Sequence, residues 1–364
     1  MDKLIEKINL LEKENEVLQQ QFLESLKQQL VLQEKIRNLE QQVNSSNNLL
    51  TQVVNVVKGL QLELEKKIGV VSFKNDIRNK NLPFELGMET EGFFYPEIEE
   101  IEATIEKVKS GKSLVRFGDG EFSLMFGEER PDFQHCNDEL KHRLREIILS
   151  EEENILIGIA DNYGSLLNYS TWAADDIRAY MTREIRSQHL SVLKKDRIYE
   201  NAYISRPYVL YGDKDTSNPK KRFEALQTIW EGKHIVILEG EKTRLGIGND
   251  LFGNVKSIER VICPAENAFS KYNEILEYIM TQDKSKMYLL ALGPTATVLG
   301  YDMAKAGFWA IDVGHVDLEY EWFLQKADKP SEVKGKYNNE FPNGNIVEDI
   351  ENVDYKQQII KIII

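Results

Sequence analysis

The stretch Leu114-Val115-Arg116-Phe117-Gly118-Asp119-Gly120-Glu121 joins a short apolar run to two carboxylates that stand one glycine apart. The run at 114–117 has the length and the β-branched and aromatic content of a buried strand. Similar runs follow at 155–159, 234–238, 260–263, 288–292 and 309–313. They alternate with helical patterns at 95–109, 139–149, 221–231, 269–282 and 296–306. This alternation predicts an α/β fold with a mainly parallel sheet and helices on its faces.

The residues that follow these strands are the candidate site residues, because ligands of such sheets bind outside the carboxyl ends of the strands. Asp119 and Glu121 follow the first strand. Mg²⁺ and Mn²⁺ prefer oxygen ligands, and their sites often combine one or two carboxylates with water and substrate phosphates. We therefore expect Asp119 and Glu121 to bind a divalent cation. The alternative is a turn in which Asp119 only caps the next helix.

The loop after the strand at 234–238 is rich in glycine and polar residues. Arg244 offers a planar fork for phosphate oxygens, and Gly246 and Gly248 let backbone N–H groups approach a ligand closely. Asn249 and Asp250 can hydrogen-bond a base or hydroxyl groups. The alternative is a surface loop in which Asn249 or Asp250 starts a helix.

The turn after the strand at 288–292 is a second candidate for phosphate binding. Gly293, Thr295 and Thr297 lie at the start of a predicted helix, together with a proline. A helix N-terminus directs free N–H groups and a positive dipole end toward an anion. The alternative is that the threonine hydroxyls and the proline serve only as capping residues.

The segment after the last strand combines one histidine with several carboxylates. His315 is suited to contact a phosphate or a metal ion, and Asp317 or Glu319 is suited to act as a general base toward an acceptor hydroxyl. Tyr320 and Trp322 alternate with these charges. We expect this segment to form a wall of the site on which a sugar or a base stacks. The alternative is a charged, solvated helix face.

The N-terminal segment keeps one heptad register from Leu4 to Leu64. Its a and d positions are apolar with four exceptions, which are Asn15, Ser25, Gln29 and Ser46. A stripe with this period predicts a coiled coil, because a single helix would leave the stripe in water. Asn15 at an a position favours a parallel homodimer over a trimer. The alternative is one amphipathic helix that packs on the catalytic domain.

Composition narrows the class of protein. The net charge of −14 argues against a protein that binds nucleic acid through clustered basic residues. Acidic residues within the first turns break the pattern of a signal peptide, and no apolar run approaches the length of about 20 residues that spans a bilayer. Cys136 and Cys263 are the only cysteines, which fits a reducing compartment. We expect a cytoplasmic protein with at most peripheral contact at the inner face of the membrane.

Several blocks of the sequence together resemble the GT-D-type glycosyltransferases of Gram-positive bacteria. The matching blocks are 116–121, 201–206, 239–252, 262–269, 292–297 and 314–322, in the order of the family. The resemblance implies a Rossmann-like domain at 92–338. We expect it to follow a coiled coil at 1–68 and a linker at 69–91, and to precede a C-terminal tail at 339–364.

The resemblance also implies a chemistry. It implies a UDP-sugar donor, with glucose or a related hexose as the sugar, and a glycan or glycoprotein acceptor at the cell surface. Mn²⁺ or Mg²⁺ would bind the Asp-x-Glu motif of Asp119 and Glu121. The candidate catalytic residues are Asp317, Glu319 and Glu241. The candidate donor-binding residues are Arg116, Arg206, Arg244, Gly246, Gly248, Asn249, Asp250, Gly293, Thr295, Thr297 and His315. Two alternatives are a silent nucleotide-sugar-binding scaffold and a nucleotide-sugar hydrolase.

Overall fold

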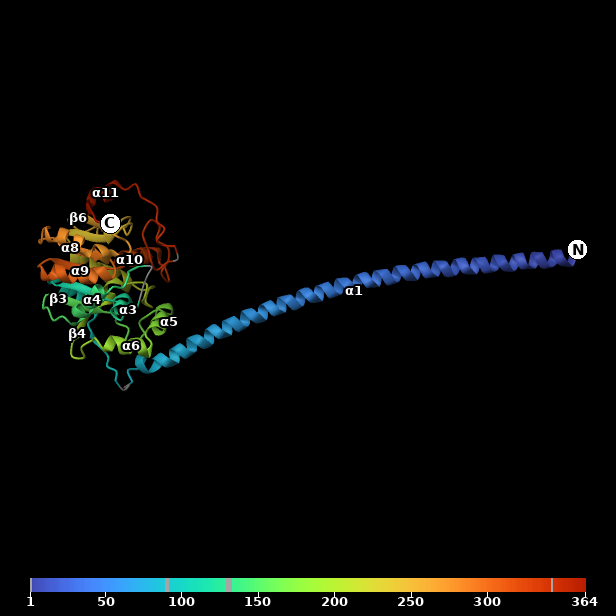
Figure 1. Ribbon diagram of the computed structural model, residues 1–364, viewed down its shortest axis with the longest axis horizontal. Coiled ribbons are helices and arrows are strands. Elements are labelled where there is room, and N and C mark those ends of the chain that lie inside the picture. Colours follow the sequence, from blue (N-terminus) through green and yellow to red (C-terminus); the bar gives the residue numbers. More distant parts are fainter. Residues whose placement is uncertain (1, 89–91, 129–132, 342) are drawn as a thin grey trace. The chain divides into compact units, whose positions relative to one another are not determined.

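The computed structural model describes residues 2–88, 92–128, 133–341 and 343–364. The chain divides into two compact units, Met1–Asn75 and Asp76–Ile364. The first unit is a single helix, and the second holds the sheet (Figure 1). None of the helices in the described residues combines the length and apolar character of a membrane span.

Helix α1, Asp2–Glu85, confirms the expected long N-terminal helix (Figure 1). It continues beyond the coil end expected near Gly69 and ends at Glu85, within the segment 69–91 that was expected as a linker. Glycine weakens a helix by about 1 kcal/mol per residue without ending it, so Gly69 is tolerated within a run of good helix formers. The apolar stripe is exposed in the single chain, for example at Leu18 and Leu60.

Part of the predicted seam lies outside the description. The side chains of Leu4, Ile8, Leu11 and Asn15 lie outside the described part of the chain. The preference for a dimer depends on Asn15, so it stays a prediction. Coiled-coil pairing also stays a prediction, because a single chain contains no partner helix.

The sheet has nine strands, in the order β1-β4-β3-β2-β8-β7-β5-β6-β9. Every described pairing between these strands is parallel. The strands are β1 Glu97–Ile98, β2 Ser113–Phe117, β3 Ile155–Ile159, β4 Ile198–Asn201, β5 His234–Gly240, β6 Ser257–Cys263, β7 Met287–Ala291, β8 Trp309–Asp312 and β9 Ile359–Ile362. The α/β class and the six expected strands are thereby confirmed. Strands β1, β4 and β9 were not expected.

The helices follow the expected pattern in part. They are α2 Ile101–Lys109, α3 Asp119–Met125, α4 Asp138–Leu149, α5 Thr171–Tyr180, α6 Arg183–Leu190, α7 Asn218–Trp230, α8 Tyr272–Met280, α9 Pro294–Lys305, α10 Val316–Gln325 and α11 Val353–Gln358, with 3₁₀ turns η1 Ala202–Ser205 and η2 Ala268–Lys271. The start of the pattern at 95–109 is strand β1 instead of helix. Helices α3, α5, α6, α10 and α11 were not expected.

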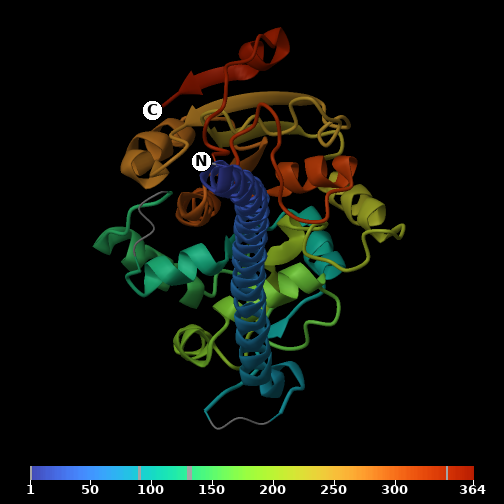
Figure 2. The same ribbon diagram turned by 90° about the vertical axis from the view of Figure 1, so that its right-hand side faces the viewer.

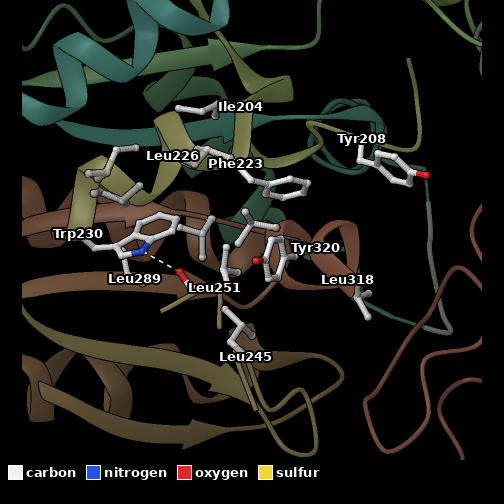
Figure 3. Close-up of a cluster of buried hydrophobic side chains, with 14 of the residues drawn as sticks. Ile204, Tyr208, Phe223, Leu226, Trp230, Leu245, Leu251, Leu289, Leu318 and Tyr320 are labelled. Atoms are coloured by element: carbon white, nitrogen blue, oxygen red, sulfur yellow. Dashed lines mark hydrogen bonds between the residues drawn. The ribbon is translucent and has the colours of Figure 1, made fainter. Parts of the chain in front are cut away.

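Helices cover both faces of the sheet, and strand side chains alternate between the two. Leu114 joins the cluster formed with α2, α7 and α10, whereas Val115 and Phe117 join the cluster formed with α3 and α4. Figure 3 shows the first cluster, in which the buried indole of Trp230 donates a hydrogen bond to the carbonyl of Leu251. This alternation leaves the strand ends, rather than the faces, for ligands.

The C-terminal residues belong to the second unit. Strand β9 pairs with β6, and α11 precedes it, so the red strand lies beside the golden edge of the sheet in Figure 2. The segment expected as a tail at 339–364 is therefore part of the sheet-bearing unit. Its isoleucine-rich end suits a strand that half covers an open edge.

Candidate active site

A cleft of about 360 Å³ lies at the carboxyl edge of the sheet, where the loops after β2 and β8 meet. It is lined after β2 by residues 118–121, after β7 by residues 291–294, and after β8 by Gly314, His315 and Asp317. The loops after β4, β5 and β6 and the segment 337–340 complete its walls. This is the position expected for a ligand of a doubly wound sheet.

Asp119 and Glu121 both lie in the first turn of α3 and line the cleft. Glu121 folds back on the turn, where Oε2 accepts a hydrogen bond from the Gly118 N–H at 2.8 Å. Burial, together with the negative charges of Asp312 and Asp119, raises the pKa of Glu121 to about 7. Glu121 thus makes a capping contact at the start of α3.

The described residues form no group of three or more metal-ligating side chains. A pair of carboxylates is nevertheless a common protein contribution to a Mg²⁺ or Mn²⁺ site, because substrate phosphates and water complete it. Burial is the main cause of the raised pKa of Glu121, and Asp312 and Asp119 contribute further negative charge. A bound divalent cation would compensate it, so the residues present fit such an ion.

Arg116 ties the sheet together beneath the cleft. Its Nη2 donates to Asp312 Oδ1 at 2.6 Å, its Nε donates to the Asp312 carbonyl at 2.9 Å, and its Nη1 donates to Ser205 Oγ at 2.6 Å. Gly314 makes room for the guanidinium, since a Cβ there would lie 2.1 Å from Nη2. Arg116 lines the cleft, but its donors are used by the protein itself.

Arg206, His315 and Glu340 form the polar wall of the cleft. Arg206 makes a two-point contact with Glu340, in which Nη1 lies 3.1 Å from Oε2 and Nη2 contacts Oε1. Arg206 Nη2 also lies 3.3 Å from Nδ1 of His315. A guanidinium can only donate, so Nδ1 accepts and the proton of a neutral His315 is on Nε2. Burial and the charge of Arg206 lower the pKa of His315, which favours this neutral form.

Glu319 lies behind Arg206 and outside the residues that line the cleft. Its Oε2 accepts hydrogen bonds from the N–H groups of Tyr208 and Val209 at 3.0 and 2.8 Å. Its Oε1 is buried without a hydrogen-bond partner among the described residues and lies 3.8 Å from Arg206 Nη1. Burial raises the pKa of Glu319 to about 7. The structure therefore gives Glu319 the position of an anchor for the chain that carries Arg206.

Asp317 reaches the cleft but is saturated with hydrogen bonds. Its Oδ1 accepts from the Gly246 N–H and from Asn249 Nδ2, both at 2.8 Å, and its Oδ2 pairs with Lys336 at 2.7 Å. The side chain is 4% exposed. These contacts fold the loop after β5 onto α10, so Gly246 and Asn249 serve that junction. Asp250, in the same loop after β5, accepts a hydrogen bond from the Tyr320 hydroxyl at 2.6 Å.

Arg244 turns away from the cleft. It is buried, and its Nη1 donates to the carbonyls of Gly335 and Glu348 at 2.7 and 2.9 Å. Gly248 and Glu241 are exposed and also lie outside the lining of the cleft. The structure thus does not bring these three predicted residues to the other site residues.

At the start of α9, one of the three predicted residues lines the cleft and two do not. Gly293 lines the cleft at a φ of +54°, and a Cβ there would lie 2.3 Å from the ring of Phe133. Thr295 Oγ1 lies 3.2 Å from Gln134 Oε1, and Thr297 Oγ1 donates to the Arg116 carbonyl at 2.9 Å. Both threonines are fully buried and do not line the cleft. Their hydroxyls hold α9 to its neighbours. Tyr320 and Trp322, which we expected to form a stacking wall, are buried in the core.

The cleft also contains residues that were not among the predicted ones, among them Asp312, Tyr337, Asn339 and Glu340. Asp312 is the last residue of β8, so the rule that residues after strands bind ligands could have found it. The other three lie in a segment without helix or strand and without a sequence pattern that marks it. Only the folded chain brings that segment to the sheet edge.

Comparison with known proteins identifies this arrangement. Residues 114–341 match the model of the family described as "Glycosyltransferase GT-D fold". The chain belongs to the GT-D glycosyltransferase family. The matched part of the GT-D domain contains all five strands that meet in the middle of the sheet, β2, β3, β5, β7 and β8.

Solved structures with the same domain agree. A structure titled "A New Glycosyltransferase (DUF1792) from Streptococcus sanguinis" is 31% identical with a TM-score of 0.69, and the match covers 74% of this chain and all of that one. Another, titled "The highly conserved domain of unknown function 1792 has a distinct glycosyltransferase fold", is 33% identical with a TM-score of 0.68, covering 73% and 95%. The GT-D fold of residues beyond the N-terminal helix is therefore shown by structure as well as by sequence.

Two curated relatives are streptococcal. The glycosyltransferase GlyD of Streptococcus pneumoniae is 34% identical over 266 residues, which are 72% of this chain and 32% of the relative. A probable glycosyl transferase Gly of Streptococcus gordonii is 37% identical over 257 residues, which are 70% and 36%. The chain thus spans about a third of the length of these relatives.

Proposed function

We propose that this chain transfers glucose or a related hexose from a UDP-sugar to a glycan or glycoprotein acceptor of the cell surface, with Mn²⁺ or Mg²⁺. The observation that carries the proposal is the cleft, in which the carboxylates of Asp119 and Glu121 share one cavity with Arg206 and His315. A diphosphate needs both a cation and hydrogen-bond donors, and this cavity offers a site for each. The names of the streptococcal relatives support the reaction class.

The proposed chemistry gives different roles to the carboxylates after β2 and to the polar wall of Arg206 and His315. Asp119 and Glu121 would hold the divalent cation, which neutralises charge on the departing nucleoside diphosphate. Arg206 would bind phosphate oxygens through its planar fork, and the Nε2–H of neutral His315 would donate a further hydrogen bond. Arg116 would position this wall through Asp312 and Ser205, without touching the donor.

The metal assignment is tested by removing charge while keeping shape. We expect Asp119→Asn and Glu121→Gln each to lower the rate of sugar transfer by about 10²–10³, because a charge-stabilising group of the transition state is lost. Glutamine keeps an oxygen for the Gly118 N–H, so the helix cap survives. The measurements are transfer from UDP-glucose with Mn²⁺ and the melting temperature of each variant.

Asp138→Asn is the matched control, since Asp138 is exposed in the first turn of α4 and lies outside the cleft. It should transfer sugar at the wild-type rate. Full activity of either cleft variant, or of the wild type in excess EDTA, would contradict the metal site. An inactive variant with a lowered melting temperature would point to misfolding, and the Mn²⁺ affinity of the folded fraction then decides.

Donor-only incubation separates the two remaining alternatives. A nucleotide-sugar hydrolase cleaves the donor rapidly without an acceptor, whereas a transferase does so slowly. A silent scaffold is stabilised against heat by the donor but turns nothing over in the presence of acceptor glycans. We expect protection by UDP-sugar together with slow donor-only cleavage.

A further inference from the structure

Both arginines of the cleft are already neutralised by carboxylates. Among the described residues that line it, five are aspartate or glutamate and two are arginine. Arg116 pairs with Asp312, and Arg206 pairs with Glu340. A nucleoside diphosphate that enters this cleft therefore meets no unpaired guanidinium, and it adds negative charge to a cavity in which carboxylates already outnumber arginines.

The two pairs differ in how easily they can open. Arg116 and Asp312 lie on neighbouring strands, and Asp312 also accepts from the Gly314 N–H at 3.1 Å. Glu340 lies in a segment without helix or strand, and its side chain is 23% exposed. Its carboxylate contacts only Arg206 and His315 in the described structure. The Arg206–Glu340 pair is thus the one that a competing anion can open.

A second carboxylate, that of Glu319, lies close to Arg206. The unpartnered Oε1 of Glu319 lies 3.8 Å from Arg206 Nη1, on the side away from the cleft lining. Glu319 is held by two backbone N–H groups, so it stays in place when Glu340 leaves. When Glu340 leaves, Glu319 is the carboxylate that remains beside Arg206.

We propose that the carboxylate of Glu340 occupies the position of a donor phosphate on Arg206 and His315, and that a nucleoside diphosphate binds by displacing it. A carboxylate and a phosphate both match the planar fork of a guanidinium, which makes them competitors for one site. The proposal rests on the proposed function, and it adds that Glu340 weakens donor binding as an internal competitor.

Glu340 is ionised at neutral pH and can compete there. Although burial opposes the charged form, Arg206 and His315 lower the pKa of Glu340 to about 2. The apparent affinity for a ligand falls by the fraction of molecules whose site is open. Removing the carboxylate charge should therefore strengthen binding, which is the opposite of what a residue that positions Arg206 for the donor would do.

The test is calorimetric titration of the full-length protein with UDP and Mn²⁺. We expect Glu340→Gln to bind UDP about tenfold more tightly than the wild type. Glu332→Gln is the matched control, because Glu332 is an exposed glutamate of the same segment and lies outside the cleft, and it should bind as the wild type does. Equal or weaker binding by Glu340→Gln would overturn the proposal.

A second pair of variants shows whether the effect passes through Arg206. In an Arg206→Gln background, the further change Glu340→Gln should alter UDP affinity by less than twofold, whereas an undiminished tenfold gain would contradict competition at Arg206. Inorganic pyrophosphate separates the two proposals. If the wild type binds neither UDP nor pyrophosphate, while Glu340→Gln binds pyrophosphate alone, the proposed nucleotide-sugar donor is contradicted and the proposed competition by Glu340 is supported. If the wild type binds UDP and Glu340→Gln binds it no more tightly, only the proposed competition by Glu340 is contradicted.

Discussion

Arg244 brings a full positive charge to a position where its side chain is 4% exposed, with a left-handed backbone at φ +55°. Its guanidinium joins the loop after β5 to two carbonyls of the C-terminal segment, those of Gly335 and Glu348. Hydrogen bonds from a charged donor are among the stronger ones, and replacing Arg244 would remove both of these. Arg244 therefore acts on the stability of the cleft rather than on its ligand.

We expect Arg244→Ala to lower the free energy of unfolding by roughly 2–4 kcal/mol and to leave UDP affinity within twofold of the wild type. Urea denaturation and calorimetric titration measure the two quantities. Lys334→Ala is the control, since Lys334 is an exposed cation of the same segment. A loss of UDP affinity at unchanged stability would show that Arg244 acts in donor binding after all.

His189 makes stability depend on pH. Its ring stacks on Phe122 of α3 at a centroid distance of 3.7 Å, and its nitrogens contact the hydroxyls of Tyr163 and Tyr180. Burial and the charge of Arg186 lower the pKa of His189 to about 3. Between pH 6.5 and 3 the unfolded chain binds a proton that the folded chain does not, so stability falls as the pH decreases through this window.

The size of this effect follows from the same pKa. At pH 4.5 the contribution of His189 should be roughly 2–3 kcal/mol less favourable than at pH 7.5. Urea denaturation at both pH values should show that His189→Gln, which cannot titrate, loses this part of the pH dependence. An identical pH dependence in the variant would mean that other groups are responsible.

Residue types alone could not distinguish residues that line the cleft from residues that hold the surrounding structure together. Asp119, Glu121, Arg206 and His315 were expected at the cleft and line it. Thr297 has an equally suitable side chain, yet it holds secondary structure together. Whether a polar side chain after a strand faces the cleft or a neighbouring loop depends on tertiary contacts that a local pattern does not contain.

At the scale of elements, the last turns of α1 are part of the sheet-bearing unit. Asn81 is buried and its Oδ1 accepts from Arg186 Nη2 at 3.3 Å. The guanidinium of Arg186 also stacks on Phe84 at 4.5 Å from the ring centroid. Glu85 pairs with Arg178 through two hydrogen bonds of 2.6 and 2.8 Å. These contacts give buried Arg186 its neighbours.

This packing predicts where the chain can be shortened. Deletion of residues 1–68 should leave a folded protein that still transfers sugar, because the contacts of Asn81, Phe84 and Glu85 remain. Deletion of residues 1–88 should lower the melting temperature by at least several degrees, because the buried guanidinium of Arg186 loses its contacts with Asn81 and Phe84. Melting curves and transfer assays of the two proteins test this. Equal stability would show that α1 contributes nothing to the unit, and an inactive but folded shorter deletion would show that the first 68 residues complete the active site.

Strong strands could be predicted and weak ones could not. The six expected strands are apolar runs that are buried on both faces, which is the pattern of a central parallel strand. β4 contains Glu200, whose charge is matched by Lys107 from α2, so its sequence looks like a loop. The coil was expected to end near Gly69, whereas α1 continues to Glu85 and its last turns pack on the sheet-bearing unit.

At the scale of the whole molecule, we propose that α1 forms a homodimeric coiled coil. The seam from Leu4 to Leu64 extends over roughly 90 Å at 1.5 Å per residue, and its described a and d side chains are exposed in a single chain. Two tethered active sites raise the local concentration of enzyme on a clustered glycan acceptor. Light scattering at micromolar concentration should give twice the chain mass of 42.1 kDa.

Charged substitutions in the seam provide the control. Leu32→Asp with Leu39→Asp places charge at two d positions and should give a monomer. Lys27→Asp with Gln41→Asp places charge on the opposite face of the helix and should leave the dimer intact. A monomeric wild type would contradict the coiled coil, whereas three chains per particle would contradict the preference drawn from Asn15.

The pairing of β9 with β6 has a consequence during synthesis. Roughly 100 residues separate the end of β6 at Cys263 from the start of β9 at Ile359, so the ribosome needs about 5–20 s to deliver the neighbouring strand. During that interval the outer edge of β6 has unpaired N–H and C=O groups, which can pair with the same edge on a nascent chain of the same polysome. Slow codons across 264–358 should therefore raise the insoluble fraction of newly made protein, whereas slow codons within α1 should not.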